Sequence, residues 1–226
     1  MGDGKEMINI LYEDNHLLGV EKPCNIPVQE DDSKDEDLLS ICKAYIKEKY
    51  QKPGNVYLGL VHRLDRPVGG CMIFARTSKA ASRLSEQMRK NEIKKAYYAI
   101  VEGMLDETSG TLIDYLVKDH KTNTVSTTDE AHGKKSILHY EVLETRNNLS
   151  LLKIQLETGR SHQIRVQISS RKHPIVNDQR YNPNAKKGQI ALHCIQLQFE
   201  HPTKKEEVIL TSKVPNEWPW TEFEVI

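Results

Sequence analysis

One carboxylate in this chain stands in a segment whose residue types are typical of an active-site loop. The segment HRLDRPVGG, residues 62–70, lies between two apolar runs at 58–61 and 71–75, which we predict to be strands. Pro67 restricts one φ angle, and the two glycines allow the positive φ angles that a tight reversal requires. Asp65 is therefore expected in a turn where a strand pair opens. Such a carboxylate either caps backbone amides or performs chemistry.

A second segment, KKAYYAIVEG at residues 94–103, combines two lysines with an aromatic pair. Its apolar, β-prone part predicts a strand that is ended by Gly103. Alternation in a strand sends Tyr97 and Tyr98 to opposite faces, so at most one of them reaches a site on a given face. A tyrosine at this position either packs in the core or contacts a substrate.

A third segment, ETGRSHQIRVQ at residues 157–167, is dense in hydrogen-bonding side chains. Its apolar residues alternate as in a strand, whereas a glycine followed by Ser161 as a cap favours a helix that continues to Arg171. We favour the helix. One turn then separates Ser161 from Arg165, and Arg165 can pair with a carboxylate from another segment.

Length and composition indicate a globular protein with a real core, since 38% of the 226 residues are hydrophobic. No stretch is apolar enough to span a membrane, and the first six residues lack the apolar segment of a secretory signal, so we expect a cytoplasmic protein. The four cysteines are far apart in sequence and predict neither a metal site nor a disulfide framework. They are expected to be buried, reduced thiols.

The formal net charge is zero, which argues against a uniformly basic surface for binding polyanions. The charge is nevertheless uneven. Residues 1–40 hold eleven acidic side chains against three lysines, a balance of −8, so the remaining residues carry +8. Basic residues recur over 76–95 and 160–187, where they either line a groove for a phosphate backbone or are scattered over solvated faces.

The elements that must position these residues are short strands with a few helices between them. Residues 30–37 form an acidic, exposed connector, and Asp37 is expected to cap a helix that ends before Pro53. A second helix is predicted at 78–91, and further strands at 8–12, 17–21, 95–101, 136–143 and 149–156. This order lacks regular βαβ alternation. We therefore predict an α+β fold with a mixed, largely antiparallel central sheet and helices packed on it.

Four motifs, taken together and in order, resemble the RluA-type family of RNA pseudouridine synthases. They are HRLD with Gly70, K-x-Y-x-A-x-V-x-G at 95–103, GRSHQIRV at 159–166 and LHxxxLxFxHP at 192–202. Two secondary matches are VEKP at 20–23 and HPIVND-x-x-Y at 173–181. The resemblance covers residues 8–202 and implies the pseudouridine synthase fold.

The resemblance implies that specific uridines in structured RNA, ribosomal or transfer, are isomerised to pseudouridine. Asp65 would correspond to the catalytic aspartate, Tyr97 to the active-site tyrosine and Arg165 to the arginine that pairs with the aspartate. A carboxylate beside the anomeric carbon suits a reaction that breaks a glycosidic bond, and Asp65 would act as nucleophile or as base. An isomerisation needs no metal or redox cofactor, so none is expected. The target base must leave its stack to reach Asp65.

RNA is the partner that the resemblance implies, and we expect no membrane or protein partner and a monomer. Candidates for RNA binding come from the first and third motifs: His62, Arg63, Arg160, His162 and Gln163. We expect one catalytic domain over residues 1–226, without a separate N-terminal RNA-binding domain. Val68 and Gly69 replace a Thr-Ser pair that is usual in the family, so a non-catalytic RNA-binding relative of the same fold is the alternative.

Overall fold

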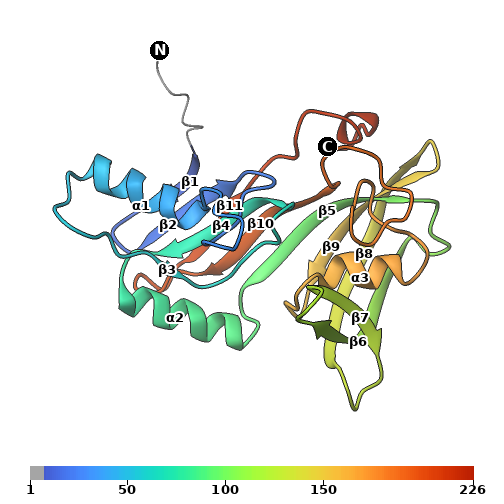
Figure 1. The fold of residues 1–226 in the computed structure, drawn as a ribbon, viewed down its shortest axis with the longest axis horizontal. Helices are drawn as coiled ribbons and strands as arrows, with labels where there is room; N and C mark the ends of the chain where they lie inside the picture. The colour runs from blue at the N-terminus through green and yellow to red at the C-terminus, as the bar shows by residue number, and fades with distance from the viewer. Residues whose placement is uncertain (1–7) are drawn as a thin grey trace. The chain divides into compact units, whose positions relative to one another are not determined.

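The computed structural model describes residues 8–226, which divide into two compact units (Figure 1). The first unit comprises residues 8–93 and Gln196–Ser212, and the second comprises Lys94–Ile195 and Lys213–Ile226. Strand β10 (Leu192–Glu200) has residues in both, because the division falls within it. Residues 1–7, where no apolar signal segment was predicted, lie outside the described residues.

The first unit is a sheet with two helices. Its strands follow the order β1-β2-β4-β10, with β3 also paired to β4 and β11 also paired to β10. The pairs β1–β2, β2–β4, β3–β4 and β10–β11 are antiparallel. The elements besides β10 are β1 (Asn9–Glu13), β2 (Leu17–Lys22), α1 (Leu38–Lys49), β3 (Gly59–Leu60), β4 (Gly69–Ala75), α2 (Ser78–Arg89) and β11 (Glu207–Thr211).

Local sequence explains where these elements begin and what they bury. The Asp37 side chain accepts a hydrogen bond from the Ser40 amide at 3.0 Å, which confirms the predicted cap of α1. Leu38, Cys42 and Ile46 then form a buried stripe at a spacing of four residues. All seven residues of β4 are buried, so the strand that follows the Asp65 segment lies at the centre of its unit.

The second unit is a larger, largely antiparallel sheet with one helix. Its strands follow the order β10-β5-β9-β8-β6-β7, and the pairs β5–β9, β9–β8, β8–β6 and β6–β7 are antiparallel. The elements are β5 (Lys94–Glu102), β6 (Ser109–Asp119), β7 (Thr124–Thr128), β8 (Lys134–Arg146), β9 (Leu149–Leu156), α3 (Gln163–Ser169) and a 3₁₀ turn, η1 (Trp220–Glu222). The predicted α+β fold with a largely antiparallel sheet is confirmed.

Two predicted elements are shorter in the structure. The strand expected at 58–61 is reduced to Gly59–Leu60, because only these residues pair with β4. The helix expected to run from a Ser161 cap to Arg171 is α3, and its N-cap residue is His162 in the left-handed region with a φ of 52°. No side chain caps the first turn, so the predicted Ser161 cap is wrong.

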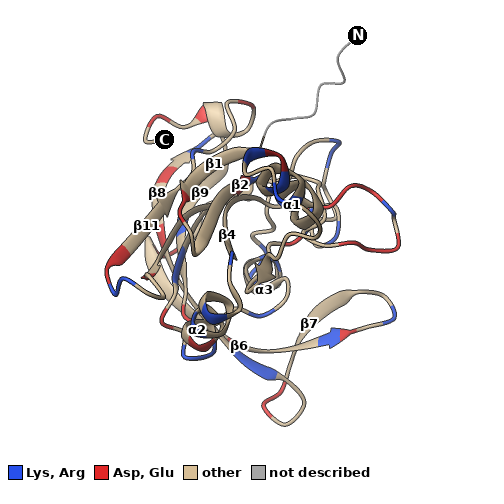
Figure 2. Cartoon of the chain, turned by 90° about the vertical axis from the view of Figure 1, so that its left-hand side faces the viewer, with Lys and Arg blue, Asp and Glu red and all other residues tan. Residues whose placement is uncertain are grey.

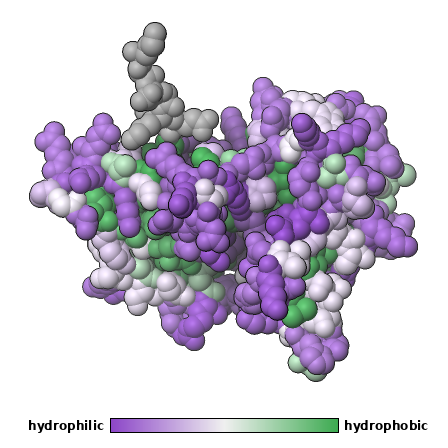
Figure 3. Space-filling view, viewed as in Figure 1, coloured by the Kyte–Doolittle hydropathy of each residue, from purple (hydrophilic) through white to green (hydrophobic). Residues whose placement is uncertain are grey.

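The acidic connector is exposed as predicted, and three of the four cysteines are buried as predicted. Residues 30–36 are exposed and appear as the red loop beside α1 in Figure 2. The face shown in Figure 3 is mainly hydrophilic, with smaller hydrophobic areas between. Cys42, Cys71 and Cys194 are buried and Cys24 is partly exposed, all as free thiols. Within residues 8–226, no helix combines the length and apolar character needed to cross a bilayer.

Candidate active site

Asp65 lies in a tight turn between β3 and β4 of the first unit. The Val68 amide donates a hydrogen bond to the Asp65 carbonyl oxygen at 2.9 Å and closes the turn. Leu64 and Val68 are buried on either side of the turn, whereas the Asp65 side chain is only half-buried. Gly70 supplies a positive φ of 119° at the start of β4. Apolar anchors thus hold a carboxylate at the surface of the unit.

The ammonium group of Lys22 holds this turn from inside the protein. Lys22 is 1% exposed, and its Nζ donates to the carbonyl oxygens of Arg66 and Val68 at 2.9 Å each. Burial lowers the pKa of Lys22 from its ordinary value to about 8, while the charge of Asp65 acts in the opposite direction. Lys22 belongs to the VEKP segment. Nothing in that segment predicts that its ammonium group binds carbonyl oxygens 44 and 46 positions away.

The two other candidates in this loop differ in exposure. His62 is 8% exposed, and its Nε2 accepts a hydrogen bond from the Ile73 amide at 3.0 Å. That bond ties the beginning of the loop to β4, which favours a positioning role for His62. Arg63 is exposed and two residues from Asp65, so its guanidinium is accessible to a phosphate.

The acidic connector contacts the residue that follows Asp65. Arg66 forms ion pairs with Asp31, at 3.3 Å, and with Asp35, and it donates to the Ser33 hydroxyl at 2.9 Å. The hydrogen bond with Asp35 raises the pKa of Arg66 and lowers that of Asp35. Hydrogen bonds from Ser33, and to a lesser degree the charge of Arg66, lower the pKa of Asp31. Acidic side chains therefore neutralise one of the two arginines beside Asp65.

In the second unit, α3 presents Arg165 to a buried carboxylate. Arg165 Nε and Nη2 donate to the two oxygens of Asp178 at 2.9 and 2.7 Å, and the side chains are 5% and 0% exposed. Asp178 Oδ1 also accepts from the Arg180 amide at 3.0 Å. Two of the five guanidinium donors serve this pair. The predicted pairing of Arg165 with Asp65 stays a prediction.

Tyr181 connects this ion pair to the β6–β7 hairpin. The Arg165 guanidinium lies over the Tyr181 ring, 5.1 Å from its centroid. The Tyr181 hydroxyl is 2.6 Å from His162 Nδ1 and accepts a hydrogen bond from the Val125 amide of β7 at 2.9 Å. Burial raises the pKa of Tyr181, so the hydroxyl keeps its proton near neutral pH. Asp178 and Tyr181 belong to the HPIVND-x-x-Y motif, but the motif by itself predicts no role for either residue.

The turn before α3 is organised by Gln163 rather than by Ser161. Gln163 is 2% exposed, and its Oε1 accepts hydrogen bonds from the Thr158 hydroxyl at 2.9 Å and the Arg160 amide at 3.0 Å. Its Nε2 donates to the Ile137 carbonyl oxygen at 3.1 Å. Gln163 and His162 are thus buried and bonded within the unit, whereas Arg160 is exposed.

Tyr97 lies in β5 opposite Ile154 of β9 and is 7% exposed, whereas Tyr98 is half-buried. The register of β5 with β9 is continuous here, so the two neighbouring side chains point to opposite faces of the sheet, as alternation predicts. Two residues earlier, burial lowers the pKa of the Lys95 ammonium. A Cβ atom on Gly159 would lie 3.6 Å from Lys95 Nζ, so this amine adjoins the loop that enters α3.

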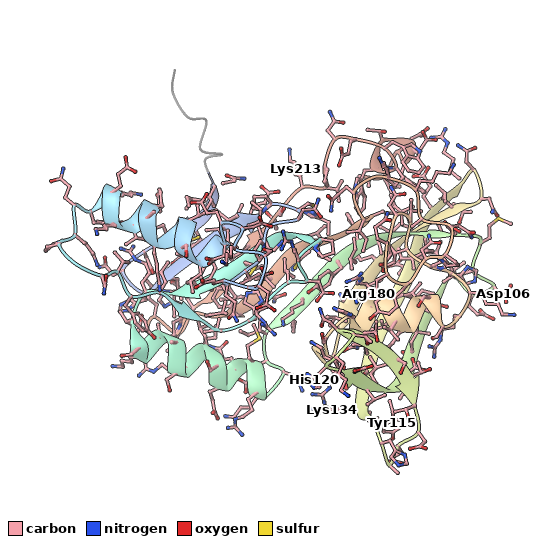
Figure 4. The ribbon with its side chains drawn as sticks, in the orientation of Figure 1. Asp106, Tyr115, His120, Lys134, Arg180 and Lys213 are labelled. Carbon is pink, nitrogen blue, oxygen red and sulfur yellow. The ribbon has the colours of Figure 1, made fainter. Side chains whose placement is uncertain are left out.

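Basic side chains gather around the β6–β7 hairpin of the same unit (Figure 4). Arg180 donates to the carbonyl oxygens of Thr122 and Asn123 at 3.1 and 3.0 Å, and so fastens the hairpin turn. His120 follows β6, and Lys134 begins β8. In residues 8–226 no three His, Cys, Asp or Glu side chains gather as ligands for a metal ion.

Comparison with known proteins agrees with these motifs. The sequence model of a family described as RNA pseudouridylate synthase matches residues 16–170. The "Ribosomal large subunit pseudouridine synthase D" of Vibrio cholerae is 32% identical over an alignment of 226 positions. The alignment covers 93% of this chain and 68% of that protein. The "Uncharacterized RNA pseudouridine synthase YhcT" of Bacillus subtilis is 32% identical over 212 residues, 92% of this chain and 69% of that protein.

Solved structures share the fold. The structure titled "Human RNA Pseudouridylate Synthase Domain Containing 4" superposes with a TM-score of 0.78 at 22% identity, over 92% of this chain and 89% of that one. At this level of identity the likeness concerns the arrangement of strands and helices. The chemistry must be argued from the residues of this chain.

Proposed function

Since the chain belongs to the RNA pseudouridylate synthase family, we propose that it isomerises uridines of ribosomal or transfer RNA with Asp65, Tyr97 and Arg165 as its catalytic residues. The family supports the catalytic interpretation over the non-catalytic alternative. Of the two RNA classes, the name of the Vibrio cholerae relative favours ribosomal RNA. The observation that carries the assignment of Asp65 is its turn, which Lys22 and two buried side chains hold in place.

The reaction exchanges one bond of the ribose for another. The bond from C1′ to N1 of uracil breaks, the base turns, and a bond from C1′ to C5 forms. N1 gains a proton and C5 loses one, so no atom is gained or lost. A half-buried carboxylate can attack C1′ as a nucleophile or remove a ribose proton as a base, and Asp65 suits both routes.

Arg165 and Tyr97 are proposed to serve the same reaction from the second unit. Asp178 holds the Arg165 guanidinium by two hydrogen bonds, so its orientation is set before substrate binds. A guanidinium so oriented stabilises an ionised carboxylate or a developing negative charge. Tyr97 offers an aromatic face to the displaced uracil. We keep the prediction that both units serve one catalytic domain, which the span of the family match, residues 16–170, supports.

Exposure divides the five residues proposed for RNA binding into two groups. Arg63 and Arg160 are exposed and are proposed to contact phosphates. His62, His162 and Gln163 are buried and form hydrogen bonds within the protein, which supports an indirect role in shaping the surface that RNA meets. Arg180, which fastens the basic hairpin, is proposed to support phosphate contacts there. A monomeric, cytoplasmic enzyme remains our prediction.

The test is the Asp65→Asn variant, which keeps the shape of the side chain but removes its charge. We expect turnover, measured as tritium release from C5-labelled uridine in ribosomal RNA, to fall roughly 10⁴-fold, as for other essential catalytic groups. RNA binding and the unfolding free energy are expected to change little. Asp32→Asn in the exposed acidic connector is the matched control and is expected to keep full turnover. Equal turnover by Asp65→Asn and wild type would contradict the assignment, and RNA binding by wild type without tritium release would favour the non-catalytic alternative.

A further inference from the structure

A cavity of about 360 Å³ lies in the second unit and has no part in the mechanism above. It is formed where the end of β5, the turn between β8 and β9, and the C-terminal tail come together. The residues that matter for its chemistry are Glu102, Asn148, Asn177, Lys186, Trp218 and Glu222. Its volume is in the range of small-molecule sites and exceeds what one nucleobase fills.

An indole on the wall distinguishes this cavity from an ordinary surface depression. Trp218 is 52% exposed, although Trp220, two residues later, is 3% exposed. Burial of a tryptophan face is strongly favourable, so an exposed indole beside a cavity is a ready stacking surface for a planar ring. Leu149 and Val176 add apolar lining. The cavity therefore favours a flat, aromatic ligand.

Two carboxylates define the polar side of the cavity. Glu102 accepts hydrogen bonds from the side-chain Nδ2 groups of Asn182 at 2.7 Å and Asn184 at 3.3 Å. Glu222 accepts one from the Nδ2 group of Asn147 at 3.0 Å. An ionised carboxylate has about four acceptor sites, so these bonds orient both groups and leave acceptor capacity. The ligand edge that meets them must therefore present hydrogen-bond donors.

Among the RNA bases, guanine fits this requirement. Its Watson–Crick edge carries two adjacent donors, N1–H and the N2 amino group, which a single carboxylate can accept together. Adenine and cytosine place a ring acceptor beside their amino group, and uracil flanks its one N–H with carbonyl oxygens. A cation on the wall, Lys186, is suited to the phosphate of the same nucleotide.

We propose that this cavity binds an unpaired guanine of the RNA substrate, stacked on Trp218 and held at its Watson–Crick edge by a carboxylate. The inference rests on the proposed function in that it takes RNA as the ligand. Unpaired bases are the usual targets of sequence-specific RNA recognition, because their edges are free of pairing partners. The cavity would thus select RNA by a base other than the uridine that reacts.

The experiment measures fluorescence anisotropy of labelled RNA pentamers that differ only at the central base: AAGAA, AAAAA and AAIAA, in which inosine lacks the N2 amino group. Wild type is expected to bind AAGAA roughly tenfold or more tightly than AAAAA, with AAIAA between them, since stacking and edge contacts act together. Trp218→Ala, and the pair of variants Glu102→Gln and Glu222→Gln, are expected to lessen or remove this preference. Met104→Ala and Glu224→Gln, at exposed positions outside the cavity, are the matched controls and should retain it.

Three results would overturn the inference: equal binding of AAGAA and AAAAA, a guanine preference that survives Trp218→Ala, or a preference lost equally in the controls.

Competition with guanosine monophosphate distinguishes a guanine of RNA from a free guanine nucleotide as the ligand. Competition at the affinity of the pentamer would identify a free nucleotide as the occupant and overturn the assignment to RNA. Tritium release by the wild type is measured in parallel. A wild type with normal turnover but no preference for guanine refutes guanine binding by the cavity and leaves the proposed reaction standing. Guanine preference without turnover refutes the proposed reaction alone.

Discussion

Arg165 and Asp178 form a bidentate ion pair in which Nε and Nη2 of the arginine donate to both carboxylate oxygens, at 2.9 and 2.7 Å. They lie 13 positions apart in sequence, and both side chains are almost fully buried. A buried charge that loses its partner is costly, because neither water nor another ion replaces it. The pair therefore serves the orientation of Arg165 as well as the stability of the second unit.

The Asp178→Asn variant tests this role. We expect the unfolding free energy to fall by about 3–5 kcal/mol, because Arg165 keeps its charge without a countercharge. Tritium release should fall as well, since the guanidinium loses its fixed orientation. Urea unfolding and the turnover assay measure the two effects. Glu86→Gln removes the exposed ion pairs with Arg89 and Lys90 and is the control, which should change the unfolding free energy far less, because solvent screens such pairs. An Asp178→Asn variant as stable as the control would contradict the assigned role.

Lys22 is expected to make turnover sensitive to alkaline pH. Burial places its folded pKa at about 8, below the ordinary value, so the folded protein loses this charge as pH rises through about 8. The neutral amine has two donors for the three carbonyl oxygens of Pro23, Arg66 and Val68, so one hydrogen bond is lost, and the loss of charge weakens the others. The Asp65 turn is then held less firmly. Turnover should therefore decrease from pH 7 to 9.5.

The Lys22→Met variant separates this effect from other ionisations. It keeps the length of the side chain but has no donor, so turnover should be roughly tenfold lower or more, with the carbonyl groups of the turn left unsatisfied. Its pH profile should lack the decrease near pH 8. The same alkaline decrease in wild type and Lys22→Met would show that another group is responsible. Lys34→Met, in the exposed connector, is the control variant.

Tyr181 is expected to couple the β6–β7 hairpin to α3, because its hydroxyl bonds Val125 and His162 while its ring lies against Arg165. Tyr181→Phe keeps the ring beneath the guanidinium but removes the acceptor of the Val125 amide and the partner of His162. We expect faster hydrogen exchange at the Val125 amide, a loss of about 1–2 kcal/mol in unfolding free energy, and a several-fold loss of turnover. Tyr57→Phe, at a half-exposed position of the first unit, should change none of these. Unchanged exchange at Val125 in Tyr181→Phe would refute the coupling.

Asp14 is expected to stabilise the first unit except in acid. Burial raises the pKa of Asp14, but hydrogen bonds from the amides of His16 and Leu17 and from the His201 side chain outweigh it and hold the pKa well below its usual range. A carboxyl with a depressed folded pKa contributes stability above its unfolded pKa, about 3.9, and loses this contribution as pH falls below it.

Urea unfolding of wild type and Asp14→Asn between pH 7 and 3 measures this contribution. The stability difference between the two proteins should stay constant down to about pH 5 and then shrink toward pH 3. Asp32→Asn, on the exposed connector, should show no such difference from wild type. A difference that is independent of pH down to 3 would show that the charge of Asp14 is not what stabilises the unit.

Much of the local structure follows from nearby residues. Asp37 begins α1 because its carboxylate reaches an amide three residues away, and β9 has the bounds that its apolar alternation predicts. The Asp65 turn is closed by a hydrogen bond between residues three apart. Sequence patterns predicted the start of an element correctly where hydrogen bonds between near neighbours determine it. They failed at the start of α3, where the Gln163 side chain bonds to Ile137 and no side chain, including that of Ser161, caps the helix.

By itself, the sequence determined the α+β class, the turn that carries Asp65 and the motifs that indicate uridine isomerisation. Only the tertiary structure decided which side chains hold those motifs in place: Lys22 beneath the Asp65 turn, Asp178 against Arg165, and Tyr181 against Val125. Each of these contacts joins residues 13 to 56 positions apart. Periodicity and capping act within a few residues, whereas such contacts depend on how strands pair and on which polar groups are buried together.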